Sequence, residues 1–378
     1  VIKLLIDNGI YVNVRNTYGR TPLQLCCENG DFKTTEVLLE HRALVNTLDK
    51  DDNNALHYAS TSSTKNIKVL KLLLDKGFNV NTPNSTGLPP LHYACLGGNV
   101  DNVKLLLENN ALINFVDEGQ NNPLHVALFW NNRNVAKFLI DNGIDINARN
   151  GNLKTALHFA CENGDYEVTE KLLENNASIN VLDKNDKNGL LYASESWESN
   201  RDLIKLLLRK GIDIDVPNKN GAPALHLACE NGDLEVAEIL LERSASVNVL
   251  DNDKNTLLHY ASAAEGDNEE LASLLVKEGV DVNAGNKNGS TALHFACRNG
   301  NFKVAKMLIG NKGLVNVLDE EDSNALFYAS ESWRSNRDII KLLISEGIDV
   351  DVRNKVGVTI SELARINDDV GIMGMLKR

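Results

Sequence analysis

Long apolar runs and tryptophan are scarce in this chain of 378 residues, and basic residues are outnumbered by acidic ones. No apolar run approaches the ~20 residues that a membrane-spanning helix needs, so the sequence predicts no membrane span. Asp and Glu outnumber Lys and Arg by 52 to 39, which gives a net charge of −13. Because such a protein repels phosphate backbones, nucleic acid is disfavoured as a partner. The first residues do not resemble a signal peptide.

Motifs of catalytic and cofactor sites are missing as well. The sequence contains no P-loop, no dinucleotide-binding glycine signature and no recognisable pairing of a nucleophile with a base. Acidic residues cluster at 49–53 and 183–186, but these stretches lack the central glycine and the twelfth-position glutamate of a calcium loop. Such residues are typical of turns. We therefore predict no enzyme activity, no cofactor and no metal site.

One short motif recurs along the whole chain. Its clearest copy is TALHFACENGD at Thr155–Asp165. The leucine of this motif, here called the anchor, stands at positions 23, 56, 91, 124, 157, 190, 225, 258, 293 and 326, and Ser361 replaces it in a degenerate last copy. Every interval is 33 or 35 residues. A fixed period of this length indicates a solenoid of stacked repeats.

Each period carries the same predicted elements. The motif itself predicts a short helix, and an Asn-Gly or other polar turn follows it. An amphipathic segment, such as 168–173, predicts a second helix, and a hairpin-like turn after a Val/Ile-Asn pair leads to the next anchor. One such repeat cannot bury its apolar face alone, so it must stack on its neighbours.

The motif Thr-Pro-Leu-His-x-Ala at this period resembles the ankyrin repeat, and the resemblance covers essentially the whole chain. It implies an all-α repeat solenoid, in which helix–turn–helix–β-turn repeats stack into an elongated curved array. We expect the outer half of a truncated repeat at 1–14, ten repeats at 15–357 and a degenerate C-terminal capping repeat at 358–378. Because Leu4 and Leu5 would meet solvent, we also expect the chain to be a fragment.

The repeats alternate between two types. Type A repeats, anchored at 23, 91, 157, 225 and 293, carry a cysteine four residues after the anchor. Type B repeats, anchored at 56, 124, 190, 258 and 326, have a turn that opens with aspartate and a glycine at the end of the second helix. Glycine there is the usual left-handed C-terminal cap. The true period is therefore a pair of repeats.

The recurring cysteines are predicted to be buried thiols. They occupy one position in alternate repeats, much farther apart than the ~7 Å between Cα atoms that a disulfide permits. These five are Cys27, Cys95, Cys161, Cys229 and Cys297. Cys26 is the exception to the pattern. Thiols outside disulfides indicate a reducing compartment.

The recurring histidines are predicted to bond backbone groups between repeats, because one per repeat cannot converge on a metal or form an acid–base site. They are His57, His92, His125, His158, His226, His259 and His294. An aromatic residue often follows, and we favour packing over a nucleic-acid stacking ladder, which would need a basic groove. These aromatic residues are Tyr58, Tyr93, Phe159, Tyr192, Tyr260, Phe295 and Tyr328.

The three tryptophans, Trp130, Trp197 and Trp333, all lie at the end of the first helix of a type B repeat. In the ankyrin family this region and the turn fingers line the concave binding face, and tryptophan is a typical interface anchor. Alternatively, each tryptophan packs under the enlarged inter-helix loop of its own repeat. Further candidates on the same face are Tyr18, Arg20, Phe129, Glu162, Glu195, Glu230, Arg298 and Glu331.

The resemblance implies a protein–protein interaction scaffold that binds a partner protein through its concave face. The negative charge favours a partner with a basic or mixed-charge surface. Two alternatives are the targeting arm of a larger enzyme or effector, with its catalytic domain outside this chain, and a mechanical spacer. We expect an intracellular, reducing location, or the inside of a host cell if the chain is an effector. The sequence is compatible with a monomer or with an oligomer of unknown size.

Overall fold

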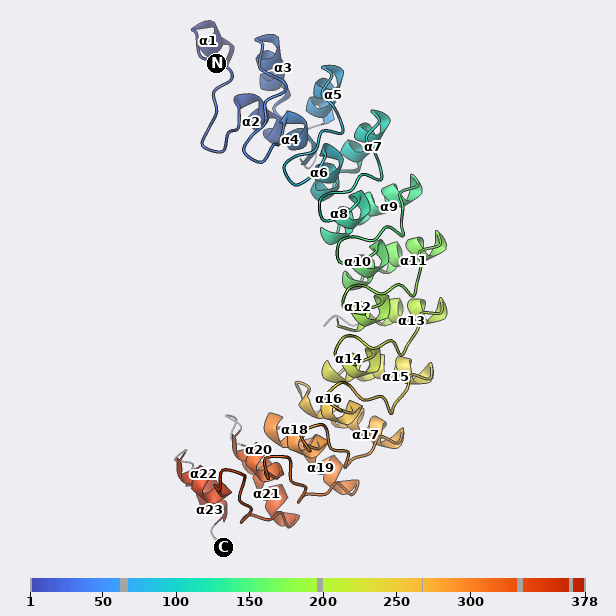
Figure 1. Ribbon diagram of the computed structural model, residues 1–378, viewed down its shortest axis with the longest axis vertical. Coiled ribbons are helices and arrows are strands. Elements are labelled where there is room, and N and C mark those ends of the chain that lie inside the picture. Colours follow the sequence, from blue (N-terminus) through green and yellow to red (C-terminus); the bar gives the residue numbers. More distant parts are fainter. Residues whose placement is uncertain are drawn as a thin grey trace. The chain divides into compact units, whose positions relative to one another are not determined.

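A computed structural model describes residues 2–61, 67–195, 200–266, 268–331, 336–366 and 370–376. The chain forms two compact units, Val1–Lys184 and Asn185–Arg378, and each is described by itself. In both units, pairs of short helices stack on one another (Figure 1). Within the described residues there is no strand, and the only bridge outside the helices joins Arg353 and Thr359. The predicted all-α repeat solenoid is confirmed.

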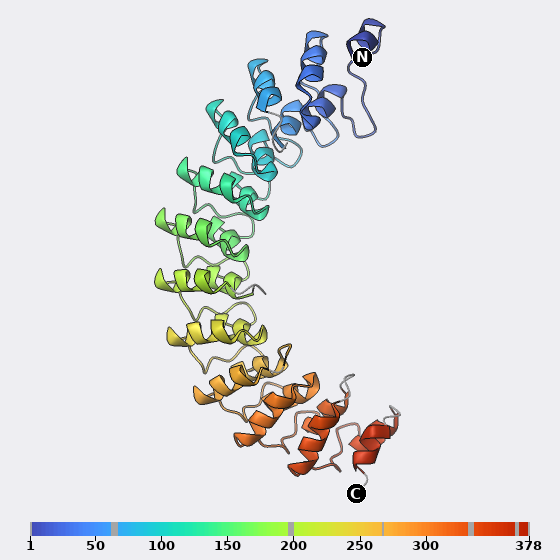
Figure 2. The same cartoon turned by 180° about the vertical axis from the view of Figure 1, so that it is seen from behind.

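The first unit has one row of inner helices, the first helix of each repeat, and one row of outer helices (Figure 2). The inner helices are α2 (Pro22–Asn29), α4 (Ala55–Thr61), α6 (Pro90–Gly97), α8 (Pro123–Phe129) and α10 (Ala156–Glu162). The outer helices are α1 (Ile2–Asp7), α3 (Phe32–Glu40), α5 (Ile67–Asp75), α7 (Val100–Glu108), α9 (Arg133–Asp141) and α11 (Tyr166–Glu174). Each helix packs against the next helix of its own row.

The second unit repeats this arrangement. Its inner helices are α12 (Gly189–Glu195), α14 (Ala224–Glu230), α16 (Leu257–Ala263), α18 (Ala292–Asn299), α20 (Ala325–Glu331) and α22 (Ile360–Ile366). Its outer helices are α13 (Arg201–Arg209), α15 (Leu234–Glu242), α17 (Glu269–Lys277), α19 (Phe302–Gly310), α21 (Arg337–Ser345) and α23 (Val370–Leu376). Neighbouring helices of each row are again in contact.

The anchor histidine starts its own helix and binds the neighbouring repeat. At α10, the Thr155 amide donates to Nδ1 of His158 over 3.0 Å, which completes a capping box. The opposite ring nitrogen, Nε2, lies 3.1 Å from the carbonyl oxygen of Val181 in the following turn. Equivalent Nε2 contacts of 2.9–3.1 Å to backbone carbonyls are made by His57, His92, His125 and His259. The predicted structural role is confirmed for these residues.

The core between the two rows consists of the anchor leucines, small alanines and the recurring cysteines. Leu124 and Ala127 are typical, since both are fully buried. The five recurring cysteines are fully buried as well, and all six cysteines are thiols outside any disulfide. Burial raises the pKa of the Cys161 thiol to about 12, so the thiolate is strongly disfavoured. The predicted interior position of this cysteine row is confirmed.

The asparagine that closes each period joins successive repeats. Oδ1 of Asn81 accepts a hydrogen bond from the Leu112 amide over 2.9 Å, and its Nδ2 donates to the Asn110 carbonyl over 3.0 Å. Where aspartate replaces asparagine, Asp215 accepts from both the amide and the hydroxyl of Ser246. This position therefore fixes the stacking of the outer helices.

Outer helices of both types end in a left-handed residue. In type B repeats this residue is glycine, as predicted, at Gly77, Gly143, Gly211, Gly279 and Gly347, with φ between 78° and 94°. Type A repeats adopt the same conformation without glycine, at Arg42, Asn110, Asn176, Ser244 and Lys312, with φ between 65° and 68°. An L side chain is strained at such φ values.

Candidate functional site

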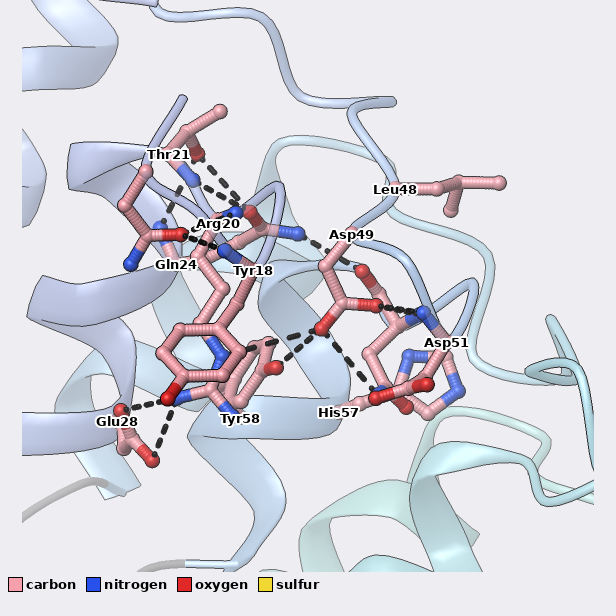
Figure 3. A network of polar contacts seen from close by, with 12 residues as sticks. Tyr18, Arg20, Thr21, Gln24, Glu28, Leu48, Asp49, Asp51, His57 and Tyr58 are labelled. Carbon is pink, nitrogen blue, oxygen red and sulfur yellow. Dashed lines mark hydrogen bonds and ion pairs between the residues drawn. The ribbon is translucent and has the colours of Figure 1, made fainter. Parts of the chain in front are cut away.

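The turn before each inner helix, here called the finger, is organised in type B repeats by a buried aspartate. Oδ1 of Asp49 accepts hydrogen bonds from the amides of Asp51 and Asn53, each over 2.9 Å. The hydroxyl of Tyr58, on α4, donates to Oδ2 of the same carboxylate (Figure 3). The tyrosine thereby links the finger to the inner helix that follows it.

The same pair recurs in the second unit. Tyr260 donates to Asp251 over 2.7 Å, and Tyr328 donates to Asp319 over 2.6 Å. Burial raises the pKa of Asp251, but hydrogen bonds from Asn255 and Tyr260 outweigh it, so the net pKa lies below the usual range. The tyrosine hydroxyl therefore stabilises the charged form of a mostly buried carboxylate.

Arg20, one of the predicted binding residues, covers the Asp49–Tyr58 pair from the side (Figure 3). Its guanidinium carbon lies 4.6 Å from the centre of the Tyr58 ring, and Nη1 lies 3.2 Å from the Glu28 carboxylate. Tyr18 lies beside it and is largely exposed. The guanidinium of Arg20 is therefore already in contact with side chains of this protein, whereas most of the Tyr18 side chain is exposed to solvent.

The repeat anchored at 124 departs from this pattern. Val126 stands where the other type B repeats have tyrosine, nine residues after the finger aspartate Asp117. In the part of the chain that the structure describes, the Asp117 carboxylate receives hydrogen bonds only from Asn121, from its amide over 2.7 Å and its Nδ2 over 3.1 Å. Asp117 is consequently half-buried, whereas the equivalent Asp251 is buried.

A pocket of about 380 Å³ lies at this departure, lined by residues of the inner helices α6, α8 and α10 and of the fingers before them. Its apolar lining is Leu88, Tyr93, Leu96, Val126, Phe129, Trp130 and Phe159, and its polar lining is His92, Asp117, Asn121, His125, Asn150, Asn152 and Lys154. The Lys154 ammonium lies 5.1 Å from the Phe159 ring centre and 2.8 Å from the Glu162 carboxylate. The pocket thus has aromatic walls, one acidic group and one basic group.

Two predicted binding residues border this pocket. Phe129 is 66% exposed and Trp130 is 55% exposed, and their ring centres lie 5.6 Å apart in an edge-to-face arrangement. Phe129 also meets the ring of Phe159, with centres 6.4 Å apart. Phe129 and Trp130 therefore both present a large part of their surface to solvent beside the pocket. Trp197 and Trp333 lie outside the described residues, as does the side chain of Glu331.

The remaining predicted residues share one position, five residues after the anchor, but their surroundings differ. Glu162 pairs with Lys154, and Glu195 pairs with Lys187 over 2.6 Å. Arg298 lies 6.0 Å from the centre of the Tyr328 ring. The structure thus places each of these side chains near the end of its own inner helix.

A second pocket, of about 340 Å³, occupies the corresponding place in the second unit. It is lined by Glu230, Tyr260 and Ala263, where the first pocket has Leu96, Val126 and Phe129. The first pocket is thus distinguished by two apolar replacements, Leu96 and Val126, and by a larger apolar side chain, Phe129, at the third position. The predictions missed Val126 and Asp117, although comparing the type B repeats with one another shows the missing tyrosine.

Membrane-spanning helices and metal-binding clusters can be assessed for the described part of the chain. There, no helix is both long and apolar enough to cross a membrane. No group of three or more His, Cys, Asp and Glu side chains is arranged to hold a metal ion within the same residues.

The family model for ankyrin repeats, in three-copy form, matches residues 1–84, 63–150, 147–218, 190–285 and 262–354. The chain therefore belongs to the ankyrin repeat family. Ankyrin repeats are in general protein–protein interaction modules, and the family is generally not catalytic.

Individual relatives match short stretches. An ankyrin repeat protein of Fowlpox virus (strain NVSL) is 37% identical over 81 residues, which are 21% of this chain and 12% of the relative. An ankyrin repeat protein of Variola virus is 33% identical over 100 residues, 26% of this chain and 17% of the relative. The human transient receptor potential cation channel subfamily A member 1 is 33% identical over 99 residues, 26% of this chain and 9% of the channel. The match thus spans less than a fifth of each relative.

Proposed function

We propose that this chain binds a partner protein through the concave face formed by its inner helices and fingers. The centre of the contact is the apolar patch of Leu96, Phe129 and Trp130, together with the pocket that these residues border. The observation that carries the proposal is the exposure of Phe129 and Trp130 beside that pocket. Aromatic side chains next to a pocket are the usual energetic centre of a protein interface.

The surroundings of the patch support the same assignment. The position of Phe129 is held by Thr61 and Ala263 in other type B repeats, so a large ring there is not needed for stacking. Charged side chains border the patch, including Lys154 and its partner Glu162. An apolar centre with a polar rim is typical of specific interfaces. The net charge of −13 favours a partner with a basic or mixed-charge surface.

A mechanical spacer would gain nothing from two exposed aromatic rings, which favour aggregation unless a partner covers them. Binding is therefore the better-supported function. The same surface would serve if this chain is the recognition arm of a larger enzyme or effector, because recognition would still occur on the repeats.

The test is a double substitution, Phe129→Ser with Trp130→Ser, compared with Leu112→Ser. Leu112 is as exposed as Trp130, at 55%, but it follows the outer helix α7. Partners would be captured from cells of the source organism, purified and titrated against each variant by calorimetry. Circular dichroism would establish that all variants remain folded.

We expect the double variant to lose at least about tenfold in affinity, because interface aromatic residues carry much of the binding energy. The Leu112→Ser control should bind like the wild type. Equal affinity of the double variant and the wild type for every captured protein would refute the proposal, as would the absence of any saturable partner.

A further inference from the structure

We infer that the pocket beside Val126 receives a tyrosine side chain from the partner protein, whose phenol hydroxyl donates a hydrogen bond to the Asp117 carboxylate. This inference rests on the proposed function, since it names the group that the partner inserts at the apolar patch. Two contacts that recur in other repeats carry the inference, because, among the residues that the structure describes, both lack a partner side chain at this pocket.

The first open feature is the hydroxyl partner of the finger aspartate. Tyr260 donates to Asp251 over 2.7 Å, and Tyr58 donates to Asp49 in the first unit. Asp117 keeps its contacts with Asn121 but has no such hydroxyl donor within the described residues. Hydrogen bonds to a charged carboxylate are roughly twice as strong as neutral ones, so a phenol placed there would bind favourably.

The second open feature is an aromatic contact of the anchor histidine. His57 meets the ring of Tyr93 on the next inner helix edge-to-face, with centres 5.2 Å apart, and His125 meets Phe159 in the same way at 5.8 Å. The ring that would follow His92 is missing, because Val126 occupies that position.

His92 contacts Phe115 instead, at 6.4 Å. Both His92 and Asp117 line the pocket, so a single ring with a hydroxyl would complete both features. The chain itself uses tyrosine for this purpose at the equivalent position of α16 and α20, where Tyr260 also meets the ring of His226 and Tyr328 also meets the ring of His294.

A basic side chain is the alternative occupant, and it fits less well. An ammonium or guanidinium group would pair with Asp117, but Lys154 already lines the pocket as a basic residue. Its walls are largely apolar and include the rings of Tyr93, Phe129 and Phe159, which suit a flat aromatic ring. The volume of about 380 Å³ lies within the range of pockets that bury small organic groups.

The direct test uses small molecules, so it does not depend on knowing the partner. The probe is p-cresol, which reproduces the tyrosine side chain. 4-Methylanisole has the same ring but cannot donate a hydrogen bond, and n-butylamine represents a lysine side chain. Each would be titrated into the full chain at neutral pH, with the indole N–H resonance of Trp130 followed by NMR. A Trp130→Phe variant assigns that resonance.

We expect p-cresol to shift this resonance and to bind about tenfold more tightly than 4-methylanisole, as a hydrogen bond to a charged group implies. Val126→Tyr, which supplies the ring from the chain itself, should abolish p-cresol binding while the protein stays folded. Asp117→Asn keeps the shape of the pocket and should reduce the preference for p-cresol over 4-methylanisole to about twofold or less. Either variant therefore tests the inference if the other is poorly folded.

A gain-of-function variant provides the matched control. Tyr260→Val should leave Asp251 and His226 without the hydroxyl and ring of Tyr260 beside the second pocket and so create a second p-cresol site, which would appear as a change of stoichiometry from one to two. If p-cresol binds no better than 4-methylanisole, or if n-butylamine binds more tightly than p-cresol, the inference is wrong.

The outcome can be separated from that of the proposed function. Val126→Tyr leaves Phe129 and Trp130 in place and should still lose at least about tenfold in affinity for the partner, if the partner inserts a tyrosine. Loss of binding in the Phe129→Ser, Trp130→Ser variant, with full binding by Val126→Tyr, would keep the proposed function and overturn the tyrosine inference.

Discussion

Gln24 donates a hydrogen bond from Nε2 to the backbone carbonyl of Asn53 over 2.8 Å. His57 makes the equivalent contact to the carbonyl of Leu88 over 3.1 Å. Gln24 also accepts from the amide of Thr21, over 2.7 Å, so it completes a capping box as the histidines do. An uncharged amide can therefore perform both structural tasks of the anchor histidine, but only the imidazole can take up a proton near neutral pH.

Replacing an anchor histidine with glutamine should weaken the pH dependence of stability. Burial lowers the pKa of His125 to about 4, whereas the unfolded chain has a histidine pKa of about 6.5. The neutral form is thus favoured on folding, so the stabilisation is complete above pH 6.5 and is lost as the pH falls towards 4. For one histidine, the loss between pH 7.5 and pH 5 is about 2 kcal/mol.

The measurement is the free energy of urea unfolding at pH 7.5 and at pH 5 for the wild type and for His125→Gln. The variant should lose about 2 kcal/mol less on acidification than the wild type does. An identical pH dependence in both proteins would show that His125 is protonated as readily in the folded protein as in the unfolded chain.

Glycine at the end of type A outer helices should stabilise the protein. Lys312 has φ of 68°, in the left-handed region that glycine adopts without steric cost. Relief of this backbone strain in Lys312→Gly is expected to raise the free energy of unfolding by about 1 kcal/mol. The greater conformational entropy of glycine in the unfolded chain offsets part of that gain. The control is Gly279→Ala, where φ is 94° and no atom would touch the added methyl group, so the cost should come from the backbone alone. A lower melting temperature for Lys312→Gly would contradict this account.

Most of the fold could be predicted from the sequence because the repeat supplies many copies of the same physical constraints. The motif around Leu157 and His158 encodes a buried anchor and a capping box, and the structure has both. The left-handed ends of type A helices could not be predicted, since a residue such as Lys312 does not signal that conformation. The repeat boundaries at 1–14, 15–357 and 358–378 stay predictions.

The candidate site was predictable only in part. Exposed aromatic side chains at the end of α8 followed from the position of Trp130, and their role in binding stays a prediction. The pocket could not be predicted, because its origin is a relation between Val126 and Asp117, which are nine residues apart. The missing tyrosine is visible in the sequence, but its hydrogen bond to the finger aspartate is visible only in the structure.

Thiol reactivity should separate Cys26 from the five recurring cysteines. Cys26 is half-buried, and burial together with the charge of Asp31 raises its pKa to about 11. The other five are fully buried, which blocks access as well as ionisation. Ellman's reagent at pH 8 should label at most one thiol slowly in the native protein and all six in guanidinium chloride. Cys26→Ala should abolish the native reaction, whereas rapid native labelling of several thiols would contradict the burial of the row.

Removing the hydroxyl of Tyr260 should destabilise the protein, because the buried Asp251 carboxylate would lose its 2.7 Å hydrogen-bond donor. Tyr260→Phe keeps the ring, so its contact with His226 is retained and the loss isolates the hydroxyl. The expected cost is about 1–3 kcal/mol at pH 7. The control is Tyr11→Phe, because Tyr11 is 64% exposed and its hydroxyl should contribute little.

Urea unfolding of both variants at pH 7 measures this difference. If Tyr260→Phe unfolds at the same urea concentration as Tyr11→Phe, water replaces the phenol at the finger carboxylate without cost. A partner tyrosine would then gain nothing from Asp117, so the same result would weaken the case for tyrosine in the pocket. A clear loss of stability would instead measure, within the chain itself, the interaction that Asp117 offers to a partner.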